Sequence, residues 1–146
     1  MHTIETPQLE RLMAALQFWS AARTGIDGLA LVGSWSPTQR DHAECDVDLV
    51  CVVDDPDQFR GEQAWMREID WPSAGLALKG WTDVDSGRAR ACHLTFDGGE
   101  AVEVSFVDRA WANTDPVDPV TRRIAGEGLR VLHDPHRLLG RLLVAL

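Results

Sequence analysis

The chain has 146 residues, of which 45% are hydrophobic and six are Trp, so it is long enough for one domain with a substantial core. Its formal net charge is −9, from 14 basic and 23 acidic residues. This balance excludes a general nucleic-acid binder, because affinity for a phosphate backbone comes mainly from Lys and Arg. We therefore expect a single domain over residues 1–146 whose acidity suits the binding of cations.

The sequence also predicts a soluble, cytoplasmic protein. No segment approaches the roughly 18–20 continuous apolar residues of a membrane span. The first five residues lack the basic and then apolar order of a signal peptide. Cys45, Cys51 and Cys92 are odd in number and lie in apolar runs, which favours reduced, buried thiols over a disulfide framework.

Hydrophobic spacing predicts the elements of the first half of the chain. Apolar residues at steps of three and four predict an amphipathic helix over 7–24, which ends at Gly25. A short apolar run predicts a buried strand over 28–32. A second strand is predicted over 46–53, and its apolar residues on both faces are typical of the centre of a sheet. A second helix is predicted over 56–70.

The second half is richer in strands. The predicted strands are 75–81, 89–96, 101–107 and 129–133, and the predicted helices are 117–126 and 135–146. Asp97-Gly98-Gly99 predicts a hairpin turn, because glycine tolerates a positive φ. Helices interspersed with strands indicate an α+β domain, with a mixed β-sheet and helices packed against it.

Two acidic residues begin the second predicted strand. Asp46 and Asp48 are two apart, so both carboxylates project to one face. At about 5 Å they would repel by roughly 3 kcal/mol at an effective dielectric near 20. Protonation, an Arg partner or a divalent cation relieves this repulsion. The alternative interpretation is a strand end whose acids are simply solvated.

Two further segments bear on this choice. Gly33-Ser34 directly follows the first predicted strand, where backbone N–H groups and a hydroxyl could approach a phosphate. Glu103 lies on the strand over 101–107, on the face opposite to Val102 and Val104. It is either a solvated strand residue or a third carboxylate beside Asp46 and Asp48.

Taken together, three motifs resemble the nucleotidyltransferase superfamily with the DNA polymerase β-like fold, especially its small stand-alone bacterial members. The motifs are Leu31-Val32-Gly33-Ser34-Trp35, Asp46-Val47-Asp48-Leu49-Val50 and Val102-Glu103-Val104. The resemblance implies a two-layer fold. It implies that Asp46, Asp48 and Glu103 are the catalytic metal ligands for two Mg²⁺, or Mn²⁺, and that Gly33 and Ser34 contact the nucleotide phosphates.

The sequence departs from the family pattern in the nucleotide loop. Ser36-Pro37-Thr38 stand where members often have a small residue, Arg and Gly, and Cys45 replaces the usual Ser before the first Asp. Arg40 is the candidate for the missing guanidinium. These departures predict weak nucleotide affinity but leave the expected metal ligands in place.

The resemblance implies a Mg²⁺-dependent nucleotidyltransferase that moves a nucleoside monophosphate from a nucleoside triphosphate, such as ATP, to a hydroxyl group. The acidic chain favours a small molecule or a protein as acceptor over nucleic acid. The alternative is an antitoxin-like binding module, or a nucleotide- or metal-binding domain with little or no transfer activity. Such a module would act on a helical protein partner.

Overall fold

The computed structural model describes residues 4–33, 45–59, 64–86 and 89–146. Its α-helices are α1 (Thr6–Ala22), α2 (Ala64–Arg67), α3 (Pro119–Gly126) and α4 (Leu138–Ala145). Its strands are β1 (Ile26–Val32), β2 (Val47–Val53), β3 (Leu78–Ser86), β4 (Ala89–Phe96), β5 (Ala101–Val107) and β6 (Leu129–His133). Three short 3-10 helices, η2 (Pro56–Phe59), η3 (Trp71–Ala74) and η4 (Arg109–Ala112), connect them.

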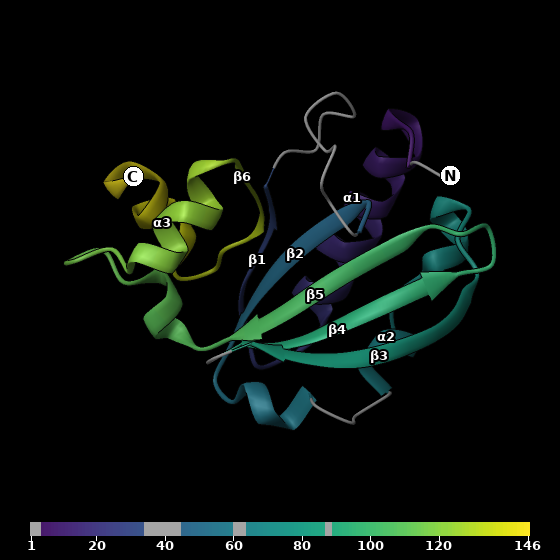
Figure 1. The fold of residues 1–146 in the computed structure, drawn as a ribbon, viewed down its shortest axis with the longest axis horizontal. Coiled ribbons are helices and arrows are strands. Elements are labelled where there is room, and N and C mark those ends of the chain that lie inside the picture. The colour runs from purple at the N-terminus through teal and green to yellow at the C-terminus, as the bar shows by residue number, and fades with distance from the viewer. Residues whose placement is uncertain (1–3, 34–44, 60–63, 87–88) are drawn as a thin grey trace.

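The strands form one six-stranded sheet in the order β3-β4-β5-β2-β1-β6 (Figure 1). β2 and β5 run parallel, and the other neighbouring pairs are antiparallel. Figure 1 shows β3 and β4 toward one edge of the sheet, and α3 and the C-terminus toward the other edge, near β6. The expected α+β class with a mixed sheet is therefore confirmed.

Helix α1 covers one face of the sheet. Its buried side chains are those of Leu9, Leu12, Met13, Leu16, Trp19 and Ser20, which form the stripe expected from their spacing. All of them except Ser20 join the larger of two hydrophobic clusters, to which β2 and β5 contribute alternate residues. Within it, the Phe106 ring stacks on Phe59 with centroids 4.4 Å apart and meets the edge of Trp65 at 5.0 Å.

A second, smaller cluster lies on the opposite face. Val50 and Val52 of β2 pack there against Leu139 and Leu142 of α4, together with residues of η4 and α3. Leu139 is so close to β1 that a Cβ added to Gly28 would come within 3.0 Å of its Cδ1 atom. Helices therefore pack on both faces, which goes beyond the two layers expected from the sequence.

Two predicted elements depart from the structure by more than a few residues at their ends. The helix predicted over 56–70 is wrong in the described residues, where η2 and the four-residue α2 take its place. Trp71 Nε1 donates to the Met66 carbonyl at 2.7 Å, and this bond engages a carbonyl that a helix continuing past Arg67 would use. The strand predicted over 75–81 lies instead at β3, Leu78–Ser86, and it pairs with β4 along its whole length.

The hairpin between β4 and β5 is confirmed. Phe96 N donates to Glu100 O at 3.0 Å across the turn, and Gly99 has a φ of 90°, which favours glycine.

The described parts of the chain contain no helix that is long and apolar enough to cross a membrane.

All three cysteines are buried, as expected. Burial, with a further contribution from Asp83, raises the pKa of Cys92 to about 12, and burial also raises the pKa of Cys51. Both thiols therefore stay protonated at neutral pH and act as small apolar side chains.

An ionic cluster fastens β1 to η4. The Asp27 side chain is only 10% exposed, and its Oδ2 accepts a hydrogen bond from Arg109 Nε at 3.2 Å. His136 Nε2 lies 3.7 Å from Oδ1. Burial raises the pKa of Asp27, but the hydrogen bond from Arg109 and the neighbouring groups outweigh it and leave the pKa below its usual value.

We predict that Phe106→Ala lowers the free energy of unfolding by about 3–5 kcal/mol, because it leaves a cavity between Phe59 and Trp65. Denaturant unfolding followed by Trp fluorescence measures this change. Phe18→Ala is the matched control, because Phe18 is 79% exposed, and it should change stability by at most about 0.5 kcal/mol. Equal losses for the two variants would contradict the described core.

We also predict that Arg109→Gln lowers the melting temperature at neutral pH and that this deficit narrows in acid. Ionised Asp27 has a lowered pKa in the folded state, so its stabilising effect is present above its unfolded pKa of about 3.9. That effect is lost as the pH falls through the folded pKa. Thermal unfolding at a series of pH values tests this, with Arg122→Gln on exposed α3 surface as control. A deficit independent of pH would rule out the ion pair as its source.

Candidate functional site

The parallel pairing of β2 and β5 places two acidic residues side by side. In its register Asp48 lies opposite Glu103, and neighbouring strands are about 4.8 Å apart. Their strand neighbours Leu49 and Val104 belong to the cluster under α1. Since side chains alternate along a strand, Asp48 and Glu103 both lie on the opposite face, where η4 and α3 pack.

A cavity of about 670 Å³ opens on this face. Its walls are residues of β1, β2, β5, η4 and α3, and both Asp48 and Glu103 line it. Among the described residues, five acidic residues line the cavity, Asp48, Glu103, Asp108, Asp118 and Glu127, against one basic residue, Arg123. An excess of carboxylates favours a cation, or an anion that arrives with one, over a bare anion.

Gly33 lies at the end of β1 and also lines this cavity. Its φ of 76° is in the left-handed region that favours glycine, and its N–H donates to the Gly128 carbonyl at 3.0 Å. A Cβ at this position would meet no atom of the described residues within 4 Å, so those residues leave that side of the backbone open. Ser34 and Arg40, the other expected phosphate contacts, lie outside the described residues.

Asp46 is held differently from Asp48. Its Oδ2 accepts a hydrogen bond from Ala101 N at 2.9 Å, and its own N–H donates to the Ala101 carbonyl at 2.9 Å. These two bonds extend the pairing of β2 with β5 by one residue. One carboxylate oxygen of Asp46 is thus engaged by backbone, and the convergence of Asp46, Asp48 and Glu103 on one metal stays a prediction.

Glu103 has a partner that the sequence did not lead us to expect. The antiparallel pairing of β4 and β5 places His93 opposite Glu103, and His93 Nε2 lies 2.8 Å from Glu103 Oε2. Ser105 Oγ donates to the other carboxylate oxygen at 3.3 Å. The two side chains of the pair are 25% and 29% exposed, so the pair is partly screened from solvent.

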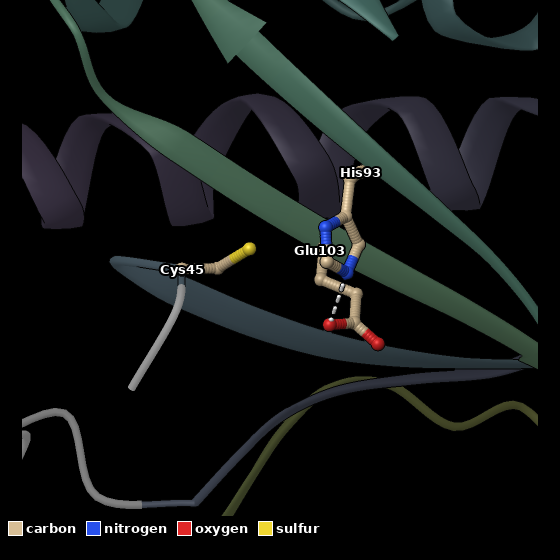
Figure 2. A group of neighbouring side chains, drawn as sticks. All are labelled: Cys45, His93 and Glu103. Carbon is tan, nitrogen blue, oxygen red and sulfur yellow. Dashed lines mark hydrogen bonds and ion pairs between the residues drawn. The ribbon is translucent and has the colours of Figure 1, made fainter. Parts of the chain in front are cut away.

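A third side chain completes a group around this pair. Cys45, just before β2, is 4% exposed, and its sulfur, a ring nitrogen of His93 and a Glu103 oxygen all lie within 4.8 Å of one another. Figure 2 shows the three side chains together, from the segment before β2, from β4 and from β5. Asp46 and Asp48 are not members of this group.

A signal for His93 is present in the sequence. Once Asp97-Gly98-Gly99 is taken as the hairpin turn, counting back along both strands pairs Thr95 with Ala101, and then His93 with Glu103. No comparable count places Cys45, because it depends on how the chain bends into β2.

Comparison with protein-family models finds no match to the chain, and comparison with curated proteins finds none either. The resemblance to nucleotidyltransferases therefore depends on the short motifs around Gly33, Asp48 and Glu103. The function is argued below from the geometry of these residues.

We predict that Mg²⁺ stabilises the protein and that Asp48→Asn removes this effect. A ligand that binds only the folded state adds about 1.4 kcal/mol to the free energy of unfolding when its free concentration is ten times its Kd. Without metal, Asp48→Asn should be slightly more stable than the native chain, because one of two adjacent negative charges is gone. Thermal unfolding with and without millimolar Mg²⁺ measures both effects.

The control for this test is Asp97→Asn, an identical change at an exposed position of the β4–β5 turn. It should keep the full response to Mg²⁺. If the native chain and Asp48→Asn respond alike, the carboxylates at this site are merely solvated acids.

Proposed function

We propose that the protein is a Mg²⁺-dependent nucleotidyltransferase that transfers a nucleoside monophosphate from a nucleoside triphosphate to a hydroxyl group. The observation that carries the proposal is the register of β2 and β5, which sets Asp48 beside Glu103 on the wall of a cavity. Gly33, on the same wall, supports it, because a residue without a side chain lets a phosphate approach the backbone closely.

The proposal includes the nucleotidyltransferase fold. Its support is the placement of the three motifs on adjacent strands, with Gly33 following β1, Asp48 on β2 and Glu103 on β5. β2 lies between the other two strands, so Gly33, Asp48 and Glu103 belong to one region of the sheet.

The donor set fits Mg²⁺, which prefers carboxylate oxygens and usually keeps several waters. Asp48 and Glu103 would hold it, with Asp46 as the third carboxylate once its oxygen turns from Ala101 N. Bound there, Mg²⁺ would neutralise part of the negative charge of the triphosphate, which the acidic cavity otherwise repels.

The binding of the phosphates and the transfer of the proton are assigned to residues of the chain itself. Gly33 lets the outer phosphates approach closely, and its N–H binds them once it is released from the Gly128 carbonyl. Ser34 donates its hydroxyl to these phosphates, and Arg40 supplies a guanidinium to them. The acceptor oxygen attacks the α-phosphorus, the bond from that phosphorus to the bridging oxygen breaks, and pyrophosphate leaves. The acceptor's proton passes to the Glu103 carboxylate, which His93 holds in place at 2.8 Å.

The cavity supports a compact acceptor. Its volume of about 670 Å³ falls within the range of about 300–1,000 Å³ that is usual for small-molecule sites. Trp111 and Ile124 line it and offer apolar surface to a base or to an acceptor. The acidic lining and the net charge of −9 disfavour nucleic acid, so the acceptor is a small molecule or a protein side chain.

A second candidate is a binding module with little or no transfer activity. The observation in its favour is that the protein itself engages Asp46, through Ala101 N, and Glu103, through His93. A chain of this kind would work in the cytoplasm by holding a nucleotide, or a helical protein partner, rather than by turnover.

Calorimetry with nucleoside triphosphates and Mg²⁺ separates the two candidates. We predict binding of at least one of them near the millimolar range, and weaker binding by Ser34→Ala of roughly 10- to 150-fold, since a hydrogen bond to a charged group is lost. Asp46→Asn should keep part of the binding but lose transfer of labelled nucleotide to an acceptor in a cell lysate.

Asp70→Asn is the control for Asp46→Asn, because Asp70 precedes η3 on an exposed surface. It should keep both binding and transfer. Absence of any heat with the folded native chain would argue against the transferase and for the protein-binding module.

A further inference from the structure

We propose that Cys45, His93 and Glu103 form a binding site for a thiophilic divalent cation, of which Zn²⁺ is the best match. The site shares Glu103 with the proposed nucleotide site but differs from it in its other ligands and in the metal it selects. It goes beyond the proposed function and does not depend on nucleotide binding or on transfer.

The first argument is the placement of the three ligand atoms. The sulfur, nitrogen and oxygen lie within 4.8 Å of one another, and they come from three separate parts of the chain (Figure 2). In a tetrahedral zinc site with bonds of about 2.0–2.3 Å, ligand atoms are about 3.3–3.8 Å apart. Metal binding therefore replaces the 2.8 Å hydrogen bond between His93 and Glu103 with bonds to the metal, and it moves the ligand atoms by about 1 Å.

The second argument is the chemistry of the donors. Mg²⁺ binds oxygen ligands, whereas one sulfur, one imidazole and one carboxylate form a set typical of zinc. The Cys45 thiol gives its proton to solvent when the sulfur binds metal. The thiolate and the Glu103 carboxylate then balance the two positive charges of the cation.

The third argument is that strand pairing and a hydrogen bond hold two of the ligands, His93 and Glu103, in position. The main-chain pairing of β4 with β5 fixes His93 opposite Glu103, so these two ligands lie on a rigid part of the sheet. Ser105 Oγ donates to Glu103 Oε1 and orients the carboxylate, as outer partners do at metal sites. Three protein ligands leave a fourth position for water or a substrate atom.

The test is a titration of the full chain with Zn²⁺ in the absence of nucleotide and Mg²⁺, with a non-thiol reductant and a chromophoric chelator as competitor. We expect one Zn²⁺ per chain. Cys45→Ser and His93→Gln should each weaken binding by at least about 100-fold, since even outer partners of a metal are worth about 10- to 100-fold.

The matched controls are Cys92→Ser and His133→Gln. Cys92 is buried among the residues under α1, and His133 ends β6 on the other side of β1 from β2. Both variants should bind Zn²⁺ as the native chain does. Circular dichroism of each variant shows that it is folded before it is titrated.

Co²⁺ gives a second readout that does not depend on affinity. Bound to the native chain, it should show a charge-transfer band from the thiolate, and Cys45→Ser should lack this band while Cys92→Ser retains it. The proposal is overturned if the folded native chain does not bind Zn²⁺. It is also overturned if Cys45→Ser and His93→Gln bind Zn²⁺ as tightly as the native chain does. If the native chain binds Zn²⁺ as expected but binds no nucleoside triphosphate, the result counts against the proposed transferase and leaves the zinc site in place.

Discussion

The parallel pairing of β2 with β5 is the constraint on which the rest of the structure depends. On one face it aligns Leu49 with Val104, and so joins both strands to the core under α1. On the other face the same register aligns Asp48 with Glu103 beside the cavity. A slip of one residue would exchange the two faces of β5 and bury Glu103 against α1. The hydrophobic core therefore enforces the position of the acidic pair, because the error that separates the acids also costs apolar burial.

The two sides of Glu103 give the sheet two different chemistries. Toward β2 its neighbour is Asp48, and a pair of carboxylates suits a hard cation and a phosphate. Toward β4 its neighbour is His93, with Cys45 close by, and this mixed set suits a softer cation. One side chain cannot serve both ligand sets fully at the same time. The choice between them depends on the metals present and on which way the Glu103 carboxylate turns.

Hydrophobic periodicity was enough to predict α1, the central strands and the hairpin, because those features follow from local sequence and from one buried face. It failed at residues 56–70, where apolar anchors such as Phe59 and Trp65 resemble a helical stripe but pack as separate contacts of η2 and α2. Asp48 and Glu103 were recognisable as site candidates from their strand positions. The backbone hydrogen bond that engages Asp46 and the approach of Cys45 depend on tertiary geometry, and no spacing in the sequence encodes them.

The edge strand β3 has a consequence for assembly. An edge strand offers unpaired backbone groups to any other extended chain, and proteins protect such edges with charges, including charges on the inner face. Asp83 pairs with Cys92 of β4, and Cys92 belongs to the cluster under α1, so the Asp83 carboxylate lies on the same face as that cluster. A strand that added to β3 would have to pack beside that charge. Asp83 thus helps to keep copies of the chain from joining edge to edge through β3.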